Sequence, residues 1–171
     1  SGDSFGCAVS LSSDGNILAV GAYNNDENGT GAGHVRVYNW NGSSWSQIGA
    51  DIDGEADNDQ SGWGISLDGA GNTIAIAAPQ NDGNGTYSGH VRIYENINNS
   101  WVQIGQDIDG ENSQDMSSSV SLSSNGRIVA IGAHYNDGSS TDAGNCRVFE
   151  NTNNTWLQIG NDIDGLSGTK E

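Results

Sequence analysis

Apolar and polar residues alternate along this chain in short runs, and the order of these runs occurs three times. Residues 17–22 (Ile-Leu-Ala-Val-Gly-Ala) are apolar on both faces, which is typical of a strand that is covered on two sides. Residues 7–12 and 34–38 alternate with the period of two that a half-buried strand shows. Residues 45–49 (Trp-Ser-Gln-Ile-Gly) form a fourth run. No stretch has helical periodicity, so the pattern predicts a meander of four short antiparallel strands in each copy.

Turn-forming residues separate these runs. Ser13-Asp14-Gly15-Asn16 contains the Asp-Gly hairpin signal, and Asn41-Gly42-Ser43-Ser44 forms the second tight turn. A polar, glycine-rich loop extends over residues 23–32. We expect the acidic stretch Asp51-Ile52-Asp53-Gly54-Glu55 to cross to the next copy.

The spacing of the copies is 56 residues from Trp45 to Trp101 and 55 residues from Trp101 to Trp156. A period near about 50 residues is typical of propeller blades or solenoid turns, and such a unit cannot bury its apolar face alone. The sequence therefore predicts an all-β, propeller-type array of three four-stranded antiparallel blades, at residues 1–56, 57–111 and 112–171. A β-helix is the alternative, although its turns usually repeat at about half this period or less.

Three motifs in the first copy resemble FG-GAP repeats, the blades of integrin-α-type β-propellers: Phe5-Gly6, Ile17-Leu18-Ala19-Val20-Gly21-Ala22 and Gly33-His34-Val35-Arg36-Val37-Tyr38. The second copy has Ser61-Gly62 and Ala77-Ala78-Pro79, and the third has Ile131-Gly132-Ala133-His134. The resemblance covers all three copies, but none carries the complete FG and GAP pair. The family's calcium loop between these two strands is replaced here by short turns, so the resemblance implies no calcium site at that position.

An Asp-x-Asp-Gly pattern nevertheless recurs in the acidic stretches. Calcium takes about six to eight oxygen ligands and needs a glycine for a sharp turn, so this pattern makes calcium a candidate cofactor. The alternative is an acidic turn that caps backbone amides and pairs with arginine, since Arg36, Arg92 and Arg147 occupy one slot in the three copies. The candidate metal ligands are Asp51, Asp53, Glu55, Asp107, Asp109 and Glu111.

The loops after the apolar strands are the candidate ligand-binding regions. Binding residues cluster on loops held by a rigid scaffold, and polar side chains beside a tyrosine suit a sugar. The alternative is an Asx-turn loop that binds nothing. The candidate residues are Tyr23, Asn25, Asp26, Asn81, Asp82, Tyr87, Tyr135, Asn136 and Asp137. Trp40 and Trp63 have no counterpart in the other copies and are further candidates for contact, whereas Trp45, Trp101 and Trp156 are expected to pack between blades.

Net charge and composition indicate which partners and which cellular location suit this chain. The chain has 22 acidic and 5 basic residues and a net charge of −17, which disfavours nucleic acid and anionic membranes. No apolar run approaches the length of about 20 residues that spans a bilayer. Acidity, scarce lysine and Asn/Gly-rich loops favour an extracellular or cell-surface protein. Cys146 takes the slot of Val35 and Val91 and is expected to be a buried free thiol, with a disulfide to Cys7 as the alternative.

Three blades are fewer than the about four to eight that close a propeller. The two outer blade faces are expected to be apolar, and exposed apolar faces drive association. We therefore expect self-association of two chains, head to tail, into a six-bladed ring. Neighbouring repeats in a longer protein, or an open array in a filament, are the alternatives.

The sequence contains no recognisable Ser/His/Asp or Cys/His arrangement and no phosphate-binding glycine loop before a helix. The expected function is therefore a non-catalytic interaction or assembly module that serves in adhesion, carbohydrate binding or a structural array, with a glycan or protein ligand. The alternative is an enzyme that acts on polysaccharide through paired carboxylates at the mouth of a propeller.

Overall fold

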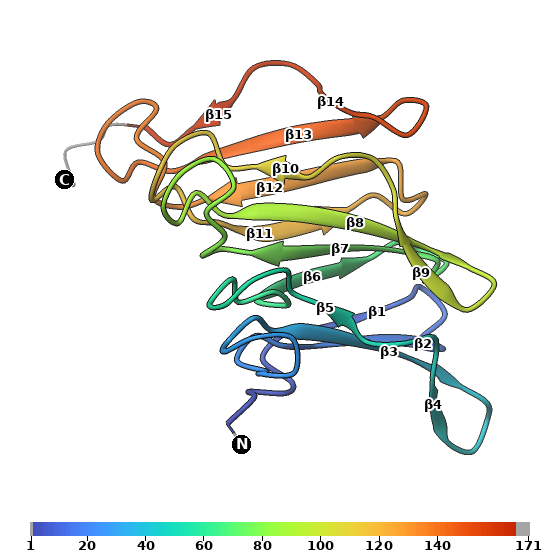
Figure 1. Cartoon of the computed structure of the whole chain (residues 1–171). Helices are drawn as coiled ribbons and strands as arrows, with labels where there is room; N and C mark the ends of the chain where they lie inside the picture. Colours follow the sequence, from blue (N-terminus) through green and yellow to red (C-terminus); the bar gives the residue numbers. More distant parts are fainter. Residues whose placement is uncertain (1, 167–171) are drawn as a thin grey trace, which may run out of the picture.

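The computed structural model describes residues 2–166, which form fifteen strands in three separate sheets without a helix (Figure 1). The three sheets are stacked in chain order, so the first and the last lie at opposite ends of the stack. We call them blade 1, blade 2 and blade 3. The prediction of an all-β chain with one antiparallel sheet per copy is confirmed for the described residues.

In blade 1 the strand order is β1-β2-β3-β4, and β5 also pairs with β3. All of these pairings are antiparallel. The strands of blade 1 are β1 (Val9–Leu11), β2 (Ile17–Ala22), β3 (His34–Trp40), β4 (Trp45–Gln47) and β5 (Ile52–Asp53).

Blades 2 and 3 repeat this arrangement. The strands of blade 2 are β6 (Gly64–Leu67), β7 (Thr73–Ala78), β8 (His90–Ile97), β9 (Ser100–Gln103) and β10 (Ile108–Asp109). The strands of blade 3 are β11 (Ser117–Leu122), β12 (Ile128–Ala133), β13 (Asn145–Asn151), β14 (Trp156–Gln158) and β15 (Ile163–Asp164).

The acidic stretch of each repeat belongs to the blade, which corrects the expectation that it only crosses to the next copy. In blade 1, β4 pairs with the end of β3 and β5 pairs with its beginning, where Ile52 lies opposite Val35. The outer strand is therefore one strand in two pieces. Gly49 lies between the pieces with a φ of 72°, a left-handed conformation that bends the chain away from β3 and that glycine adopts without strain. Ile52 is buried, and its burial brings the chain back to the sheet.

Two hydrophobic cores lie between the blades. Strand β7 is buried on both faces, as its apolar sequence predicts: Ile74 and Ile76 pack toward blade 1, and Ala75 and Ala77 pack toward blade 3. The core between blades 1 and 2 comprises Ala19, Val35, Val37, Ile52, Leu67, Ile74, Ile76 and Tyr94. The core between blades 2 and 3 comprises Ala75, Ala77, Val91, Ile93, Ile108, Val129, Ile131, Phe149 and Trp156.

Among residues 2–166, no sheet covers the outer faces of blades 1 and 3. Leu11 of blade 1 and Ile163 of blade 3 are exposed there, whereas their counterparts Leu67 and Ile108 in blade 2 are buried between blades. Both cysteines are free, and Cys7 is exposed. Cys146 is only half-buried, which corrects the expectation of a buried thiol, because it lies on the uncovered face of blade 3.

Candidate functional site

The predicted ligand-binding loops follow the second strand of each blade, over residues 23–33, 79–89 and 134–144. Because each loop leaves an equivalent strand end, the three loops lie at one edge of the stack. The segments that connect consecutive blades, residues 54–63 and 110–116, reach the same edge and hydrogen-bond to these loops. We call this edge the loop face.

The three predicted asparagines form the frame of the loop face. Their side-chain oxygens accept bonds from backbone N–H groups two residues ahead, at 2.8–2.9 Å, which is an Asx turn. Their amide groups donate to aspartates: Asn25 to Asp3, Asn81 to Asp59 and Asn136 to Asp115. All three side chains are buried, so their hydrogen-bonding groups are engaged inside the protein.

The three predicted aspartates close the same loops. Asp26 accepts a bond from the backbone N–H of Gly31, Asp82 from that of Tyr87, and Asp137 from that of Asp142, at 2.7–2.8 Å. Each bond spans five residues, so it fixes the width of its loop. This part of the prediction thus lies at the loop face, but its side chains support the backbone.

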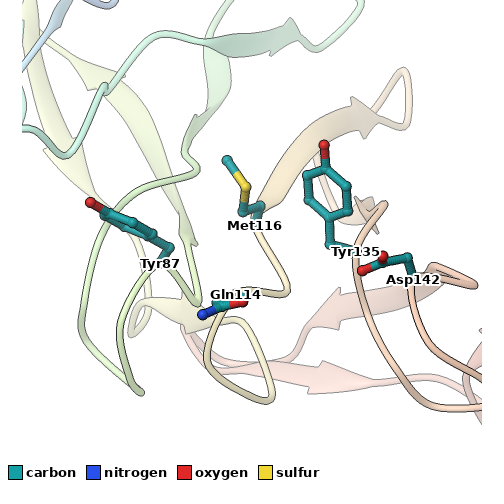
Figure 2. Close-up of a pocket in the computed structure, with 5 residues that line it drawn as sticks. All are labelled: Tyr87, Gln114, Met116, Tyr135 and Asp142. Atoms are coloured by element: carbon teal, nitrogen blue, oxygen red, sulfur yellow. The ribbon is translucent and has the colours of Figure 1, made fainter.

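The tyrosines, by contrast, project from the loop face. Figure 2 shows Tyr87 and Tyr135 on opposite sides of Met116, with Gln114 between the loops and Asp142 beside Tyr135. These five residues line a cavity of about 390 Å³. Tyr87 and Tyr135 come from blades 2 and 3, and they are 44% and 45% exposed. The structure therefore brings two of the three predicted tyrosines together at one cavity.

A second cavity of about 460 Å³ adjoins the first and shares Met116 and Tyr135 with it. Tyr23, the third predicted tyrosine, packs against Trp63 here in a tilted contact, with ring centroids 4.8 Å and planes 60° apart. Tyr135 packs against His134 in a second tilted contact, with ring centroids 4.1 Å and planes 43° apart. The other residues lining this cavity are Asn24, Gln60, Pro79, Gln80 and Ser118.

The two cavities combine exposed aromatic rings with uncharged amide and hydroxyl groups. Such a surface can cover the apolar face of a ring-shaped ligand and hydrogen-bond to its hydroxyl groups. Among the described residues that line the two cavities, Asp142 alone carries a carboxylate. A pair of carboxylates, as the alternative of a polysaccharide-acting enzyme requires, does not line either of them.

Met116 and Gln114 were not among the predicted residues. Both have a left-handed backbone, with φ of 53° and 71°, as do Gln60 and Asn58 one repeat earlier. The repeat thus fixes the backbone at these places while the side chains differ. The sequence could have indicated this cavity in one way. The three copies differ in residue type at positions where the backbone conformation repeats, and such positions are candidates for ligand contact.

Four of the predicted metal ligands, Asp51, Asp53, Asp107 and Asp109, lie in or beside the outer strands, whereas Glu55 and Glu111 lie in the connecting segments. None of the six lines either of the two cavities described above. In blade 1, Asp51 accepts bonds from the Arg36 guanidinium at 2.7–2.8 Å and from Gln47 at 2.7 Å. The bond from Arg36 lowers the pKa of Asp51. Burial raises the pKa of Asp53 and of Asp109, whose carboxyl groups lie closer to the interior of the stack.

Three of the six predicted metal ligands belong to clusters that include a histidine. One cluster comprises Glu27, His34 and Asp51, and the other comprises Glu55, His90 and Asp107. The ligand atoms of each cluster lie within 4.8 Å of one another. Each cluster offers one nitrogen and two carboxylates, which are fewer oxygen atoms than calcium takes.

An arginine pairs with a carboxylate of each cluster: Arg36 binds Asp51, and Arg92 lies 3.0 Å from Glu55. Glu111 is engaged by Asn136 and Asn145 at 3.0–3.3 Å. Calcium binding by the predicted ligands stays a prediction, which thermal unfolding with added calcium and with a chelator would test.

Comparison with known proteins supports the repeat and the fold. Residues 1–38 match the FG-GAP repeat. No curated protein matches the chain. Among solved structures, a protein assigned as a 6-phosphogluconolactonase of Bacteroides uniformis is similar with a TM-score of 0.62 and 13% identity, over 91% of this chain and 40% of that one. TolB of Acinetobacter baumannii is similar with a TM-score of 0.50 and 14% identity, over 92% of this chain and 32% of that one. The chain thus spans less than half of each structure.

These likenesses overturn one expectation from the sequence, that the chain is not an enzyme. The fold is shared with a protein assigned as an enzyme, the lactonase, so the absence of a familiar catalytic motif was no ground for excluding catalysis. At 13% identity the likeness shows the fold alone, and the lactonase activity belongs to that protein and is not transferred to this chain.

The family match and the structural likeness agree with the repeated sheets described above. A propeller-type arrangement of three antiparallel blades is confirmed, and its residues 1–38 match the FG-GAP repeat.

Proposed function

We propose that the chain is an extracellular or cell-surface interaction module that binds a neutral carbohydrate at its loop face. The observation that carries this proposal is the gathering of Tyr23, Trp63, Tyr87 and Tyr135 from three blades around Met116. Rings from separate blades meet there because the repeat brings each loop to the same edge of the stack.

The chemistry of this surface supports a sugar as the ligand. Tyrosine and tryptophan present an apolar ring with a polar tip, which matches the apolar face and the hydroxyl rim of a pyranose. The amides of Asn24, Gln60 and Gln80 lie beside the rings and supply both donors and acceptors. The net charge of −17 disfavours phosphorylated or acidic sugars, so a neutral sugar fits best.

Two observations support a location outside the cell. FG-GAP repeats are typically extracellular, and one matches residues 1–38. The surface is strongly acidic, with 22 acidic residues against 5 basic ones. Residues 2–166 contain no helix with the length and apolarity of a membrane span.

The experiment is titration of the chain with a panel of neutral glucose-, galactose- and mannose-based oligosaccharides, followed by calorimetry and tryptophan fluorescence. We expect Trp63→Ala and Tyr135→Ala each to weaken binding by up to about tenfold, because an aromatic contact contributes about 0.5–1.5 kcal/mol. Trp40→Ala is the matched control, since Trp40 is exposed at the opposite end of its strand.

No binding across the panel at millimolar sugar, or an equal loss in the Trp40 variant, would contradict the proposal. The same mixtures are analysed for released products, because the fold is shared with a protein assigned as a lactonase. Turnover that Trp63→Ala abolishes would identify the loop face as a catalytic surface rather than a binding surface.

A further inference from the structure

Three side-chain hydrogen bonds occur at both interfaces between blades. The tryptophan of each outer strand donates its indole N–H to an isoleucine carbonyl of the preceding blade. Trp101 donates to Ile48 at 3.0 Å, and Trp156 donates to Ile104 at 2.9 Å. These bonds join the outer strands of adjacent blades.

The other two bonds lie deeper in the stack. The arginine of the third strand donates to an aspartate carbonyl of the preceding blade, from Arg92 to Asp53 at 2.9 Å and from Arg147 to Asp109 at 2.6 Å. A serine hydroxyl accepts a leucine backbone N–H of the following blade, at 2.9 Å at both interfaces. The interface between blades is therefore a repeated, directional contact.

The two ends of the stack carry the two halves of this contact. The outer face of blade 1, which we call the head face, carries Leu11, Arg36 and Trp45 at the positions of the following blade. The outer face of blade 3, which we call the tail face, carries Ser121, Ile159 and Asp164 at the positions of the preceding blade. Trp45 Nε1 has no hydrogen-bond partner among residues 2–166.

Apolar side chains on the head face and the tail face are exposed because no neighbouring blade covers them within the described residues. Leu11 is 58% exposed, whereas its counterpart Leu67 is 6% exposed against blade 1. Ile163 is 62% exposed, whereas its counterpart Ile108 is 4% exposed against blade 3. The residue types are the same, so the difference comes from the neighbouring blade alone. Each end thus exposes apolar side chains that the repeat buries elsewhere.

Arg36 shows the effect of the missing neighbour on a charged group. In blade 2, Arg92 extends to the carbonyl of Asp53 and to the carboxylate of Glu55, both from the blade 1 side of the interface. No blade precedes that of Arg36 within residues 2–166, and Arg36 binds Asp51 of its own blade instead. A carbonyl placed like that of Asp53 would therefore offer Arg36 the contact that its counterpart makes.

We propose that a second copy of this chain docks head to tail, with its tail face on the head face of the first, and that two copies close on each other. In this arrangement Trp45 donates to the carbonyl of Ile159, Arg36 donates to that of Asp164, and the N–H of Leu11 donates to Ser121. Each chain has one head and one tail, so two chains satisfy both ends. The inference concerns the ends of the stack and does not depend on the loop face.

The first experiment is measurement of the mass in solution by sedimentation and light scattering, from micromolar to submillimolar chain. The expected result is the mass of two chains, with tighter association at higher salt, because a charge of −17 on each chain opposes docking. A single-chain mass at all concentrations would overturn the proposal. A concentration-dependent series of longer species would overturn closure by two copies.

The second experiment uses one variant for each end. Leu11→Asp places a carboxylate in the head face, and Ile163→Asp places one in the tail face. We expect each to weaken self-association more than about tenfold, because docking would bury an unpaired charge. Val102→Asp, at an exposed position in the middle blade, is the matched control that keeps the mass of two chains.

Mixing the two variants separates head-to-tail docking from the other arrangements. The intact tail of the Leu11→Asp chain and the intact head of the Ile163→Asp chain form one undamaged interface, so the mixture is expected to contain the mass of two chains. A mixture that stays monomeric, or an effect of one variant only, would overturn head-to-tail docking. Far-ultraviolet circular dichroism of each variant confirms that the chain is folded.

Discussion

Asn136 donates its side-chain amide to the carboxylate of Asp115 across 2.9 Å, and both side chains are almost fully buried. Asn136 lies in the loop after β12, and Asp115 lies in the segment that enters blade 3. Asn81 and Asp59 repeat this contact at 3.0 Å one blade earlier. The contact ties each loop of the loop face to the preceding connection, so it sets the position of the rings that project between them.

Replacing Asn136 by alanine is expected to lower the free energy of unfolding by about 1–3 kcal/mol, because the buried carboxylate of Asp115 loses a donor. Chemical denaturation measures the change. Asn25→Ala is the matched control: Asn25 occupies the same place in blade 1, but its bond to Asp3 is longer, at 3.3 Å, and lies at the open end of the stack. A loss in the control as large as in the Asn136 variant would contradict this interpretation.

The same logic applies to the tryptophans of the outer strands. Trp156 is buried in the core between blades 2 and 3, so Trp156→Ala is expected to cost about 3–5 kcal/mol of stability. Trp156→Phe keeps most of the ring but removes the indole N–H, and it is expected to cost about 1 kcal/mol for the lost bond to Ile104, together with a smaller packing loss.

Trp40→Ala is the control for these variants, because Trp40 is exposed at the end of β3 and contacts the ring of Trp45. Its stability is expected to change by less than about 0.5 kcal/mol. Thermal and chemical denaturation of all three variants give the comparison. A Trp156→Ala chain as stable as the Trp40→Ala chain would show that the outer strands contribute little to the stack.

Much of the fold follows from patterns that local physics determines. The run at residues 17–22 is apolar on both faces, and it coincides with β2 because only a strand between two other layers can bury both faces. The broken outer strand was not predicted. The pairing of β5 with β3 depends on a bend at Gly49 and on two residues of sequence, which is too short for an alternating pattern to appear.

The candidate site was predicted in part for a similar reason. The sequence indicates where a loop lies, but it does not indicate which of its side chains, for example Tyr23 or Asn25, point inward and which point outward. Only the fold shows that the asparagine turns inward to an aspartate of a distant segment and that the tyrosine turns outward. Met116 reaches the cavity because of contacts between two blades, which no local pattern contains.

His90 is expected to make stability depend on pH. Burial lowers its pKa to about 4 and the charge of Arg92 acts in the same direction, while Asp107 opposes them. Above pH 6.5, the ordinary pKa of histidine, the folded and unfolded forms are both neutral and the full stability is present. Between pH 6.5 and about 4 the unfolded chain takes up a proton that the folded chain excludes, so stability falls by up to about 1.4 kcal/mol per pH unit.

The test compares the chain with a His90→Asn variant, because Asn145 holds the same position in blade 3 and is accepted by the fold. Apart from Asp107 and Glu55, which face His90, the carboxylates keep the same surroundings in both proteins. The difference between the two unfolding free energies therefore isolates His90 together with its two acidic neighbours. That difference is expected to be constant above pH 6.5 and to move against the unmodified chain on acidification. Parallel curves down to pH 4 would contradict the neutral, buried state of this histidine.

Cys146 reports directly on docking at the tail face. It occupies the position of Val35 and Val91, which are fully buried between blades, but it is only half-buried at the end of the stack. Docking of a second copy would cover it, so its rate of reaction with a thiol reagent is expected to fall as the chain concentration rises. Cys7 is exposed on a different part of the molecule and provides an internal control in the same sample. Mass spectrometry of labelled peptides separates the two rates.

Protection of Cys146 requires an intact interface, so the Leu11→Asp variant is expected to keep Cys146 reactive at every concentration. Protection that persists in that variant would show that something other than the head face of a second copy covers this thiol.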